Sequence, residues 1–278
     1  MVVLFNKFSK ADLSYYLHKS QMAMRELTAE SFNSKTLKTF FTEDAYKTTK
    51  PNTVIVQSRA TEKPVEIVYE CIHNISKKFE DFTFSFFRPN DKSSRVAMKD
   101  FVIERSFLPF LKPKFDCGLM QTNVEDFVGL GVRADELQVK EAISKGVSKI
   151  SRMSTPKATL YHVRMGYLPK PELVRVRSTR EIMSQIFKMT QFSDIDRKFY
   201  TPIIVVKKGL FGPRYYIDTN TTQAIANIRH INYVSCGNPL IAKGMHFSSD
   251  HIRMELSGKN FDTWRRMIDG TYDFSTEV

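Results

Sequence analysis

The pattern of apolar residues changes at Thr53, and the four segments that follow, up to Glu104, constrain the fold more than any other feature. The segments are TVIVQS, PVEIVYECI, DFTFSFF and RVAMKDFVIE, all rich in β-branched and aromatic residues and separated by Pro, Asn, Asp and Lys. Such runs favour strands, in which successive side chains point to opposite faces of a sheet. We therefore expect consecutive strands here, with the alternating Phe residues of the third segment in the core.

Helical patterns precede this block. Ser9 and Asp12 have the spacing of a capping box, in which a hydroxyl at the N-cap is followed three residues later by a carboxylate. The apolar residues after it share one helical face. They are Leu13, Tyr16, Leu17, Met24 and Leu27. A second, short helix is expected over 34–47, before a turn at Lys50-Pro51-Asn52.

The second half of the sequence mixes helical and strand patterns. A helix is expected over 133–153, because Val139, Ile143, Val147 and Ile150 recur at helical spacing. A second capping box, Ser178 to Glu181, begins a helix that runs to about Lys188. The remaining expected elements are strands over 158–166, 172–178 and 251–256, a strand–turn–strand unit over 201–218, and a helix over 260–270 capped by Gly270.

Together these patterns predict an α+β fold with an antiparallel β core, sandwich or jelly-roll-like, with an N-terminal helical segment and inserted helices. They divide the chain into a helical segment at 1–50, a β-rich main domain at 51–260 with helices near 133–153 and 178–188, and a C-terminal helix and tail at 261–278. The stretch 108–118 contains two prolines and is expected to be a loop or an edge.

Composition narrows the class of protein. The 278 residues include 42 Lys and Arg against 30 Asp and Glu, a net charge of +12 that favours partners such as nucleic acid or acidic lipid. The three cysteines, at 71, 117 and 236, form no CxxC pair, so neither a disulfide framework nor a zinc knuckle is expected. The N-terminal apolar run is too short for a signal peptide, and no window is long enough for a membrane span. A soluble, cytosol-facing chain is therefore expected.

Catalytic motifs are absent from the sequence. It contains no HExxH, GxSxG or Walker motif, and GLGV at 129–132 lacks the third glycine of a dinucleotide fingerprint. A metal site from His246, Asp250 and His251 is disfavoured because these residues flank an expected turn, and Cys236 near His230 is more simply a strand residue than a nucleophile. Two carboxylate pairs are most simply loop or cap residues: Glu125 with Asp126, and Asp194 with Asp196. No catalytic residue, metal or cofactor is predicted, and an unrecognised enzyme is kept as an alternative.

The excess positive charge is concentrated between Arg164 and Arg214. This segment holds eleven Lys or Arg residues and four Asp or Glu residues, a net charge of +7. Cations that follow a phosphate backbone, with aromatic rings for bases to stack on, are the ingredients of single-strand binding. The proposed cations are Arg164, Arg175, Arg177, Arg180, Lys207, Lys208 and Arg214, and the interleaved rings are Tyr161, Tyr167, Phe199, Tyr200, Phe211, Tyr215 and Tyr216. The alternative is a solvated basic face over a Tyr/Phe core.

The segment RYYIDTNTTQAIANIRHINYVSCGNPLIAKGMHFSSDHI, at 214–252, resembles the last shared block of the thirty-kilodalton superfamily of plant-virus movement proteins. In that family a polar, helix-like segment precedes a strand of the type N-I-R-x-[IV] and a Gly/Pro turn. Here the three parts are 219–226, 227–231 and Gly237-Asn238-Pro239. ATLYHVRMGYL at 158–168 is similar to the family's early strand, and DIDRK at 194–198 to its Asp before a basic residue.

The resemblance implies a non-enzymatic viral protein that binds single-stranded nucleic acid or nucleocapsids without sequence preference. It implies host plasmodesmal or membrane components as partners, a location in the host cytoplasm and at plasmodesmata, and transport of the genome between plant cells. A homo-oligomer is left open. On this interpretation Gly237 and Pro239 form a turn, Cys236 and Ile231 pack, and Arg229 joins the nucleic-acid-binding cations. A further alternative is a viral matrix-like protein that binds acidic membrane and nucleocapsid.

Overall fold

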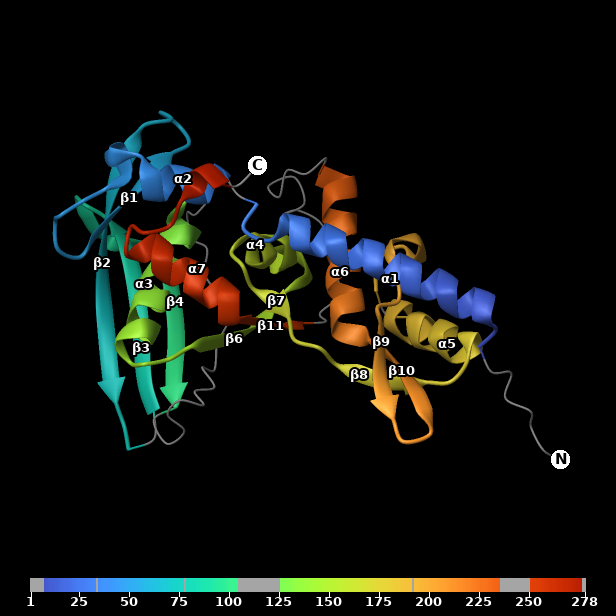
Figure 1. Ribbon diagram of the computed structural model, residues 1–278. Coiled ribbons are helices and arrows are strands. Elements are labelled where there is room, and N and C mark those ends of the chain that lie inside the picture. The colour runs from blue at the N-terminus through green and yellow to red at the C-terminus, as the bar shows by residue number, and fades with distance from the viewer. Residues whose placement is uncertain are drawn as a thin grey trace. The chain divides into compact units, whose positions relative to one another are not determined.

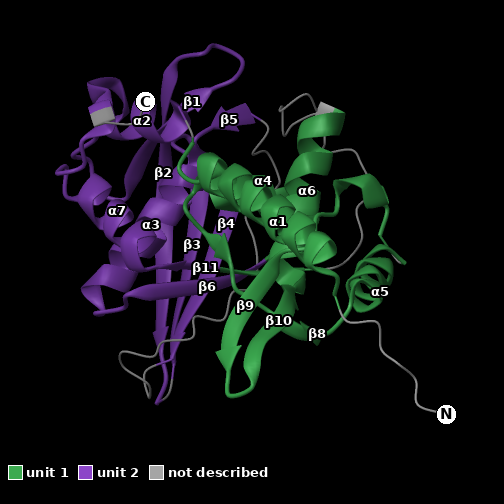
Figure 2. Ribbon diagram, turned by 45° about the vertical axis from the view of Figure 1, so that its right-hand side comes forward, with its two compact units in different colours: residues 1–33, 154–254 green, residues 34–153, 255–278 purple. Residues whose placement is uncertain are grey.

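The computed structural model describes residues 8–33, 35–77, 79–104, 126–191, 193–235 and 251–276. The chain forms two compact units, each assembled from two segments that are distant in sequence (Figure 2). Unit 1 consists of Met1–Asn33 and Ser154–Met254, and unit 2 of Ser34–Met153 and Glu255–Val278. These units differ from the consecutive segments expected at 1–50, 51–260 and 261–278. Composition along a chain reports neighbours in sequence, whereas long-range contacts define a compact unit.

Unit 2 is built on a five-stranded antiparallel sheet in the order β4-β3-β2-β1-β5 (Figure 1). The strands are β1 (Thr53–Ser58), β2 (Pro64–Ile75), β3 (Phe79–Arg88), β4 (Asp91–Glu104) and β5 (Phe127–Val128). The four strands expected between Thr53 and Glu104 are therefore confirmed, as is the α+β class with an antiparallel β core. Because β1 to β4 are neighbours both in sequence and in the sheet, each short connection returns the chain beside the strand it has just left.

One face of this sheet carries the aromatic core of unit 2. Phe82, Phe84 and Phe86 alternate along β3 and are all buried. Phe101 lies opposite Phe82 on β4, and the two rings stack with centroids 4.6 Å apart. Lys99 projects from the same face and binds Asp135 of helix α3 (Leu130–Ser144). The predicted burial of the Phe run is confirmed.

Helices α2 (Lys35–Thr42) and α7 (Gly258–Ile268) also belong to unit 2. The helix expected over 34–47 is divided, because a 3-10 turn at Asp44–Tyr46 follows α2. Trp264 of α7 is fully buried and meets Phe41 of α2 edge to face, with ring centroids 5.9 Å apart. Gly129, before α3, has a φ of 88°, and a Cβ there would lie 1.9 Å from the Phe40 ring, so this position requires glycine.

The helix expected over 133–153 ends earlier, and this expectation is corrected. α3 stops at Ser144, and strand β6 (Lys149–Ser154) follows it, so Ile150 lies on a strand. Gly146 has a φ of 70°. Its N–H donates to the Ile143 carbonyl, and the Val147 N–H donates to the Ala142 carbonyl. This pair of hydrogen bonds is the Schellman arrangement that ends helices, and the apolar spacing beyond it continues by coincidence.

Unit 1 surrounds a smaller antiparallel sheet in the order β8-β10-β9. Its strands are β8 (Leu173–Val176), β9 (Ile204–Gly209) and β10 (Gly212–Asp218), and its helices are α1 (Lys10–Glu30), α4 (Thr159–Arg164), α5 (Thr179–Thr190) and α6 (Thr219–Ser235). The strands expected over 172–178 and 201–218 are confirmed. Strand β7 (Leu168–Pro169) also lies in unit 1, and β11 (Ile252–Ser257) begins in unit 1 and ends in unit 2. The strand expected over 251–256 is β11.

The core of unit 1 lies between the β8-β10-β9 sheet and helices α1, α5 and α6 (Figure 1). Ile204 and Ile217 are buried on one face of the sheet and belong to the same cluster as Ile182 and Ile186 of α5. Tyr16 and Leu17 of α1 pack against this cluster. Helices α1, α5 and α6 therefore cover this face of the sheet.

Both predicted capping boxes begin helices. Ser9 Oγ accepts the Asp12 N–H at 3.0 Å, and Ser178 Oγ accepts the Glu181 N–H at 3.3 Å. Gly270 follows α7 with a φ of 69°, as expected of a C-terminal cap. On α1 the expected apolar face needs one correction, since Met24 is exposed and Ala23 is buried instead. Across the described ranges, no helix is both long and apolar enough to cross a membrane.

Two strands that the resemblance implied are helical, and both expectations are corrected. Residues 158–166 contain α4, which Gly166 ends with a φ of 82°. Residues 227–231 lie within α6. Asp218 caps α6 by accepting the Thr221 N–H at 3.1 Å, and the helix continues through the polar segment into the apolar one. Ile231 is buried as expected, but it packs from a helix.

Candidate nucleic-acid interface

The face of the β8-β10-β9 sheet opposite the core brings three of the predicted cations together. On the central strand β10, Tyr216 lies opposite Arg175 of β8, and Arg214 lies opposite Lys207 of β9. Directly opposed residues of antiparallel strands project to the same side. We call the set Arg175, Lys207, Arg214 and Tyr216 the basic sheet face.

Alternation along β10 shows that this face points away from the core. Ile217, next to Tyr216, is fully buried in the core of unit 1. Tyr215 also faces the core and meets Phe8 edge to face, with ring centroids 5.4 Å apart. Tyr216 and Arg214 must therefore point to the other side. There Arg175, Lys207 and Arg214 are exposed and Tyr216 is half-buried.

Local contacts hold two of the cations close to the strands. The Lys207 ammonium lies over the Tyr216 ring, 5.3 Å from its centroid. A Cβ on Gly209 would lie 2.8 Å from Arg214 Nε, so the Arg214 side chain crosses β9 over that glycine. Cation–π contacts of this kind are weak at exposed sites, about 0.5–1 kcal/mol. A stronger ligand such as a phosphate can therefore draw Lys207 off the ring at little cost.

The other predicted cations separate into two groups. Lys208, Arg177 and Arg180 are exposed, like the three on the basic sheet face. Lys208 lies opposite Pro213 and so leaves β9 on the side opposite to Lys207. Arg177 and Arg180 follow β8, at the start of α5. Within the described part of the chain, none of these six cations forms an ion pair.

Arg164 and Arg229 differ from those six because α1 neutralises both. Arg164 Nε lies 3.1 Å from Glu30 Oε2, and Arg229 Nη2 lies 2.8 Å from Glu26 Oε2. Arg229 also donates to the Phe199 carbonyl and to Thr201 Oγ1. We therefore assign these two arginines to the internal structure of unit 1 and leave them out of the basic sheet face.

Most of the aromatic residues predicted to interleave with the cations do not face them. Tyr167 and Tyr200 are buried, and Tyr215 faces the core. Phe199 packs with Tyr233 at a centroid distance of 5.4 Å, and the Lys198 ammonium lies 4.7 Å from the Tyr233 centroid. Sequence reasoning missed Tyr233, because it lies beside Phe199 only when 219–235 is one helix, and 227–231 was expected as a strand. The basic sheet face itself retains one ring, that of Tyr216.

The groups considered for catalysis or metal binding do not form a site in the described ranges. Those ranges contain no cluster of three metal-ligating side chains. His230 is nearly buried and packs edge-on against Phe199, and burial lowers its pKa. His251 is exposed before β11. Several residues and segments named in the sequence analysis lie outside the described ranges: Cys117, Glu125, Cys236, Gly237, Pro239, His246, Asp250 and 108–118.

The two described carboxylates of the predicted pairs have local structural roles. Asp126 Oδ2 accepts from Arg88 Nη2 at 2.7 Å. Asp196 caps the short 3-10 turn Arg197–Phe199, where its Oδ1 accepts the Lys198 N–H at 3.0 Å. That backbone hydrogen bond, assisted by the Lys198 ammonium, lowers the pKa of Asp196. Asp196, which the resemblance compares with the family's Asp before a basic residue, therefore caps the start of a 3-10 turn.

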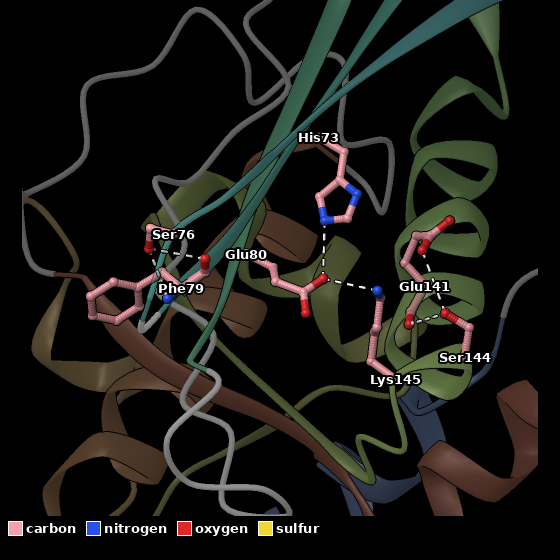
Figure 3. Close-up of polar contacts among 7 residues, drawn as sticks. All are labelled: His73, Ser76, Phe79, Glu80, Glu141, Ser144 and Lys145. Carbon is pink, nitrogen blue, oxygen red and sulfur yellow. Dashed lines mark hydrogen bonds and ion pairs between the residues drawn. The ribbon is translucent and has the colours of Figure 1, made fainter.

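Unit 2 contains charged clusters of its own, in which carboxylates pair with cations. Glu80 Oε2 lies 3.0 Å from His73 Nε2 and 2.9 Å from Lys145 Nζ (Figure 3). Asp135 Oδ1 is fully buried, 2.6 Å from Lys99 Nζ and 2.8 Å from Arg152 Nη2. Burial opposes ionisation of Asp135, but the two cations outweigh it and hold the pKa of this carboxyl well below its usual range.

No protein-family model, curated protein or solved structure matches this chain.

Proposed function

We propose that this protein binds single-stranded nucleic acid without sequence preference, through the basic sheet face. The observation that carries the proposal is the position of Tyr216, beside three exposed cations that lack an ion-pair partner among the described residues. Elsewhere in unit 1, Arg164 and Arg229 are matched by carboxylates. Cations left unmatched on one face are available for an anionic ligand.

The arrangement supplies the two contacts that such binding uses. Arg175, Lys207 and Arg214 can each neutralise a phosphate, and binding then releases the counterions condensed on the strand. Tyr216 can stack on one base, which typically contributes about 1–3 kcal/mol. Phosphate contacts carry no sequence information, and every base has a face on which a ring can stack, so the expected binding is tolerant of sequence.

Transport of a viral genome between plant cells is the wider role that the resemblance implies, and we retain it as a proposal. The basic sheet face supports this role. The segments at 158–168 and 227–231 lend it no support, since they do not form the strands that the resemblance assigned.

Titration with a fluorescent oligonucleotide of about 20 nucleotides tests the binding proposal. The test variant replaces Arg175, Lys207 and Arg214 by Ala. The control replaces Arg25, Arg59 and Lys63 by Ala, since these are also two arginines and one lysine, exposed and outside the basic sheet face. Affinity is measured by anisotropy between about 50 and 200 mM salt.

The face variant should lose about tenfold or more in affinity, and its log–log salt slope should be shallower by about 2, or about 0.7 for each lost phosphate contact. The control should keep the wild-type slope. If the face variant kept the wild-type affinity and slope, the proposed interface would be wrong.

A further inference from the structure

The β9–β10 hairpin ends in two large apolar side chains that have no cover. Leu210 is 91% exposed and Phe211 is 97% exposed. They connect Gly209 to Gly212, which lie opposite each other at the ends of the two strands. Gly212 has a φ of 113°, so the turn depends on glycine there. Polar residues are usual in such a turn, and the hairpin points away from the helices of unit 1 (Figure 1).

Positive charge surrounds the base of this tip. Lys207 and Lys208 precede it and Arg214 follows it, and all three are exposed. Lys207 and Arg214 project from one side of the hairpin, while Lys208 leaves β9 on the other side. The stretch from Val206 to Tyr216 contains no Asp or Glu. Exposed cations therefore lie on both sides of the hairpin next to its apolar tip, and no carboxylate stands within this stretch of the strands.

We propose that this hairpin binds anionic membrane surfaces by inserting Leu210 and Phe211 into the boundary between headgroups and acyl chains. In that position the two apolar side chains leave water, and the three cations remain at the depth of the lipid phosphates. The dimensions agree. Leu210 is three positions after Lys207, about 10 Å along an extended strand, and interfacial apolar groups reach about 5–10 Å below the headgroups.

A bilayer fits this feature better than a protein pocket does. The apolar surface is a narrow convex tip of two residues, and the charge lies around it on both sides of the hairpin, not on one edge. An anionic bilayer offers both a penetrable apolar phase and a continuous layer of negative charge. The two proposals share Lys207 and Arg214. Leu210 and Phe211 belong to this proposal alone, and Arg175 and Tyr216 belong to the nucleic-acid proposal alone.

Vesicle co-sedimentation of the full chain is the first test. Phosphatidylcholine vesicles with about 30% phosphatidylserine should bind the protein, and pure phosphatidylcholine vesicles should not. Leu210→Ser with Phe211→Ser should weaken partitioning by about tenfold or more. The matched control is Ile72→Ser with Phe187→Ser, an aliphatic and an aromatic side chain that are each 57% exposed elsewhere. The control should partition like the wild type.

Insertion is tested separately by fluorescence. The chain has one tryptophan, Trp264, which is fully buried, so Phe211→Trp adds a reporter at the tip. Lipids brominated near the headgroup end of the acyl chain should quench the added tryptophan in anionic vesicles and leave Trp264 of the wild type unquenched. Binding without quenching would overturn insertion, because the contact would then be one of charge alone.

Equal partitioning of the tip variant and the wild type would overturn the proposal, as would the absence of any vesicle binding. The affinity for oligonucleotide shows whether the membrane proposal fails alone or together with the nucleic-acid proposal. The Leu210→Ser, Phe211→Ser variant keeps Arg175, Lys207, Arg214 and Tyr216, so it should bind oligonucleotide within about twofold of the wild type.

Discussion

The interiors of unit 2 and unit 1 differ in their use of charge. In unit 2, Lys99, Asp135 and Arg152 are nearly or fully buried and bind one another. Arg133 is also buried there, and it donates to the Phe40 and Ile55 carbonyls and to Glu136. The interior of unit 1 relies largely on neutral groups, whereas six cations on its surface have no ion-pair partner among the residues described.

A short chain of amides illustrates the interior of unit 1. Gln223 donates to Asn227 at 3.0 Å, and Asn227 donates to Thr159 at 3.2 Å. The comparison separates two uses of a charged side chain. A buried and paired charge is needed by the fold, since losing one partner leaves the other uncompensated. An exposed and unpaired charge is not needed by the fold, and so it is free for a ligand.

The largest expected effect comes from breaking a buried pair in unit 2. Asp135→Asn removes the carboxylate that pairs with both Lys99 and Arg152, which should cost about 3–5 kcal/mol of unfolding free energy. Urea unfolding followed by the fluorescence of Trp264 reports on unit 2. The control is Asp126→Asn, whose ion pair with Arg88 is half-exposed and should contribute less than about 1 kcal/mol. Equal losses in the two variants would show that the buried network does not stabilise unit 2.

Acid gives an independent measure of the same pair. The folded-state pKa of Asp135 lies below its ordinary value, so its contribution to stability is complete above about pH 5. Below that pH the unfolded chain takes up the proton first, and the contribution declines as pH falls towards the folded-state pKa. The wild type should therefore lose more stability than Asp135→Asn between about pH 5 and pH 2. Parallel curves would contradict this assignment.

A smaller effect is expected from the ring on the basic sheet face. Tyr216→Ala should weaken oligonucleotide binding by about tenfold, as expected for the loss of one stacked base, while the salt slope stays unchanged because the ring carries no charge. Tyr216→Phe keeps the stacking surface and should bind like the wild type. A shallower slope in Tyr216→Ala would mean that the ring acts by positioning Lys207.

The smallest binding effect is expected at the two paired arginines of unit 1. Arg164→Ala and Arg229→Ala should each change oligonucleotide affinity by less than about twofold. Each should lower stability by about 1 kcal/mol, because their ion pairs with α1 are partly exposed. Anisotropy and urea unfolding give the two values for each variant. A tenfold loss of affinity would return that arginine to the interface.

Local sequence patterns predicted an element correctly where the residues within that element determine its structure. The strands between Thr53 and Glu104 and the helix that begins at Ser178 follow from alternation and capping within a few residues. Two of the errors occur where a glycine ends a helix. Gly146 and Gly166 both adopt positive φ after a helix, at 70° and 82°. The signal from Gly146 was missed because the helical spacing of apolar residues continues past it. Gly166 follows α4, which is too short to show a helical repeat of apolar residues.

The basic sheet face could be predicted in part, for a related reason. Arg175, Lys207 and Arg214 stand in strand patterns, so their exposure follows from alternation. The partner of Arg164 is 134 residues away in sequence, and that of Arg229 is 203 residues away. No pattern local to either arginine identifies its carboxylate. The register that places Tyr216 opposite Arg175 is likewise a property of the folded sheet.

The discontinuous build of the two units also sets the order in which they can form as the chain is made. Every described part of unit 1 has been synthesised by Met254, whereas α7 of unit 2 is the last of the described α-helices and strands to be made. Until then the cavity that receives Trp264 stays open, although the sheet of unit 2 was finished more than a hundred residues before. Unit 1 can thus close first on the ribosome, and the sheet made earliest must wait for the end of the chain.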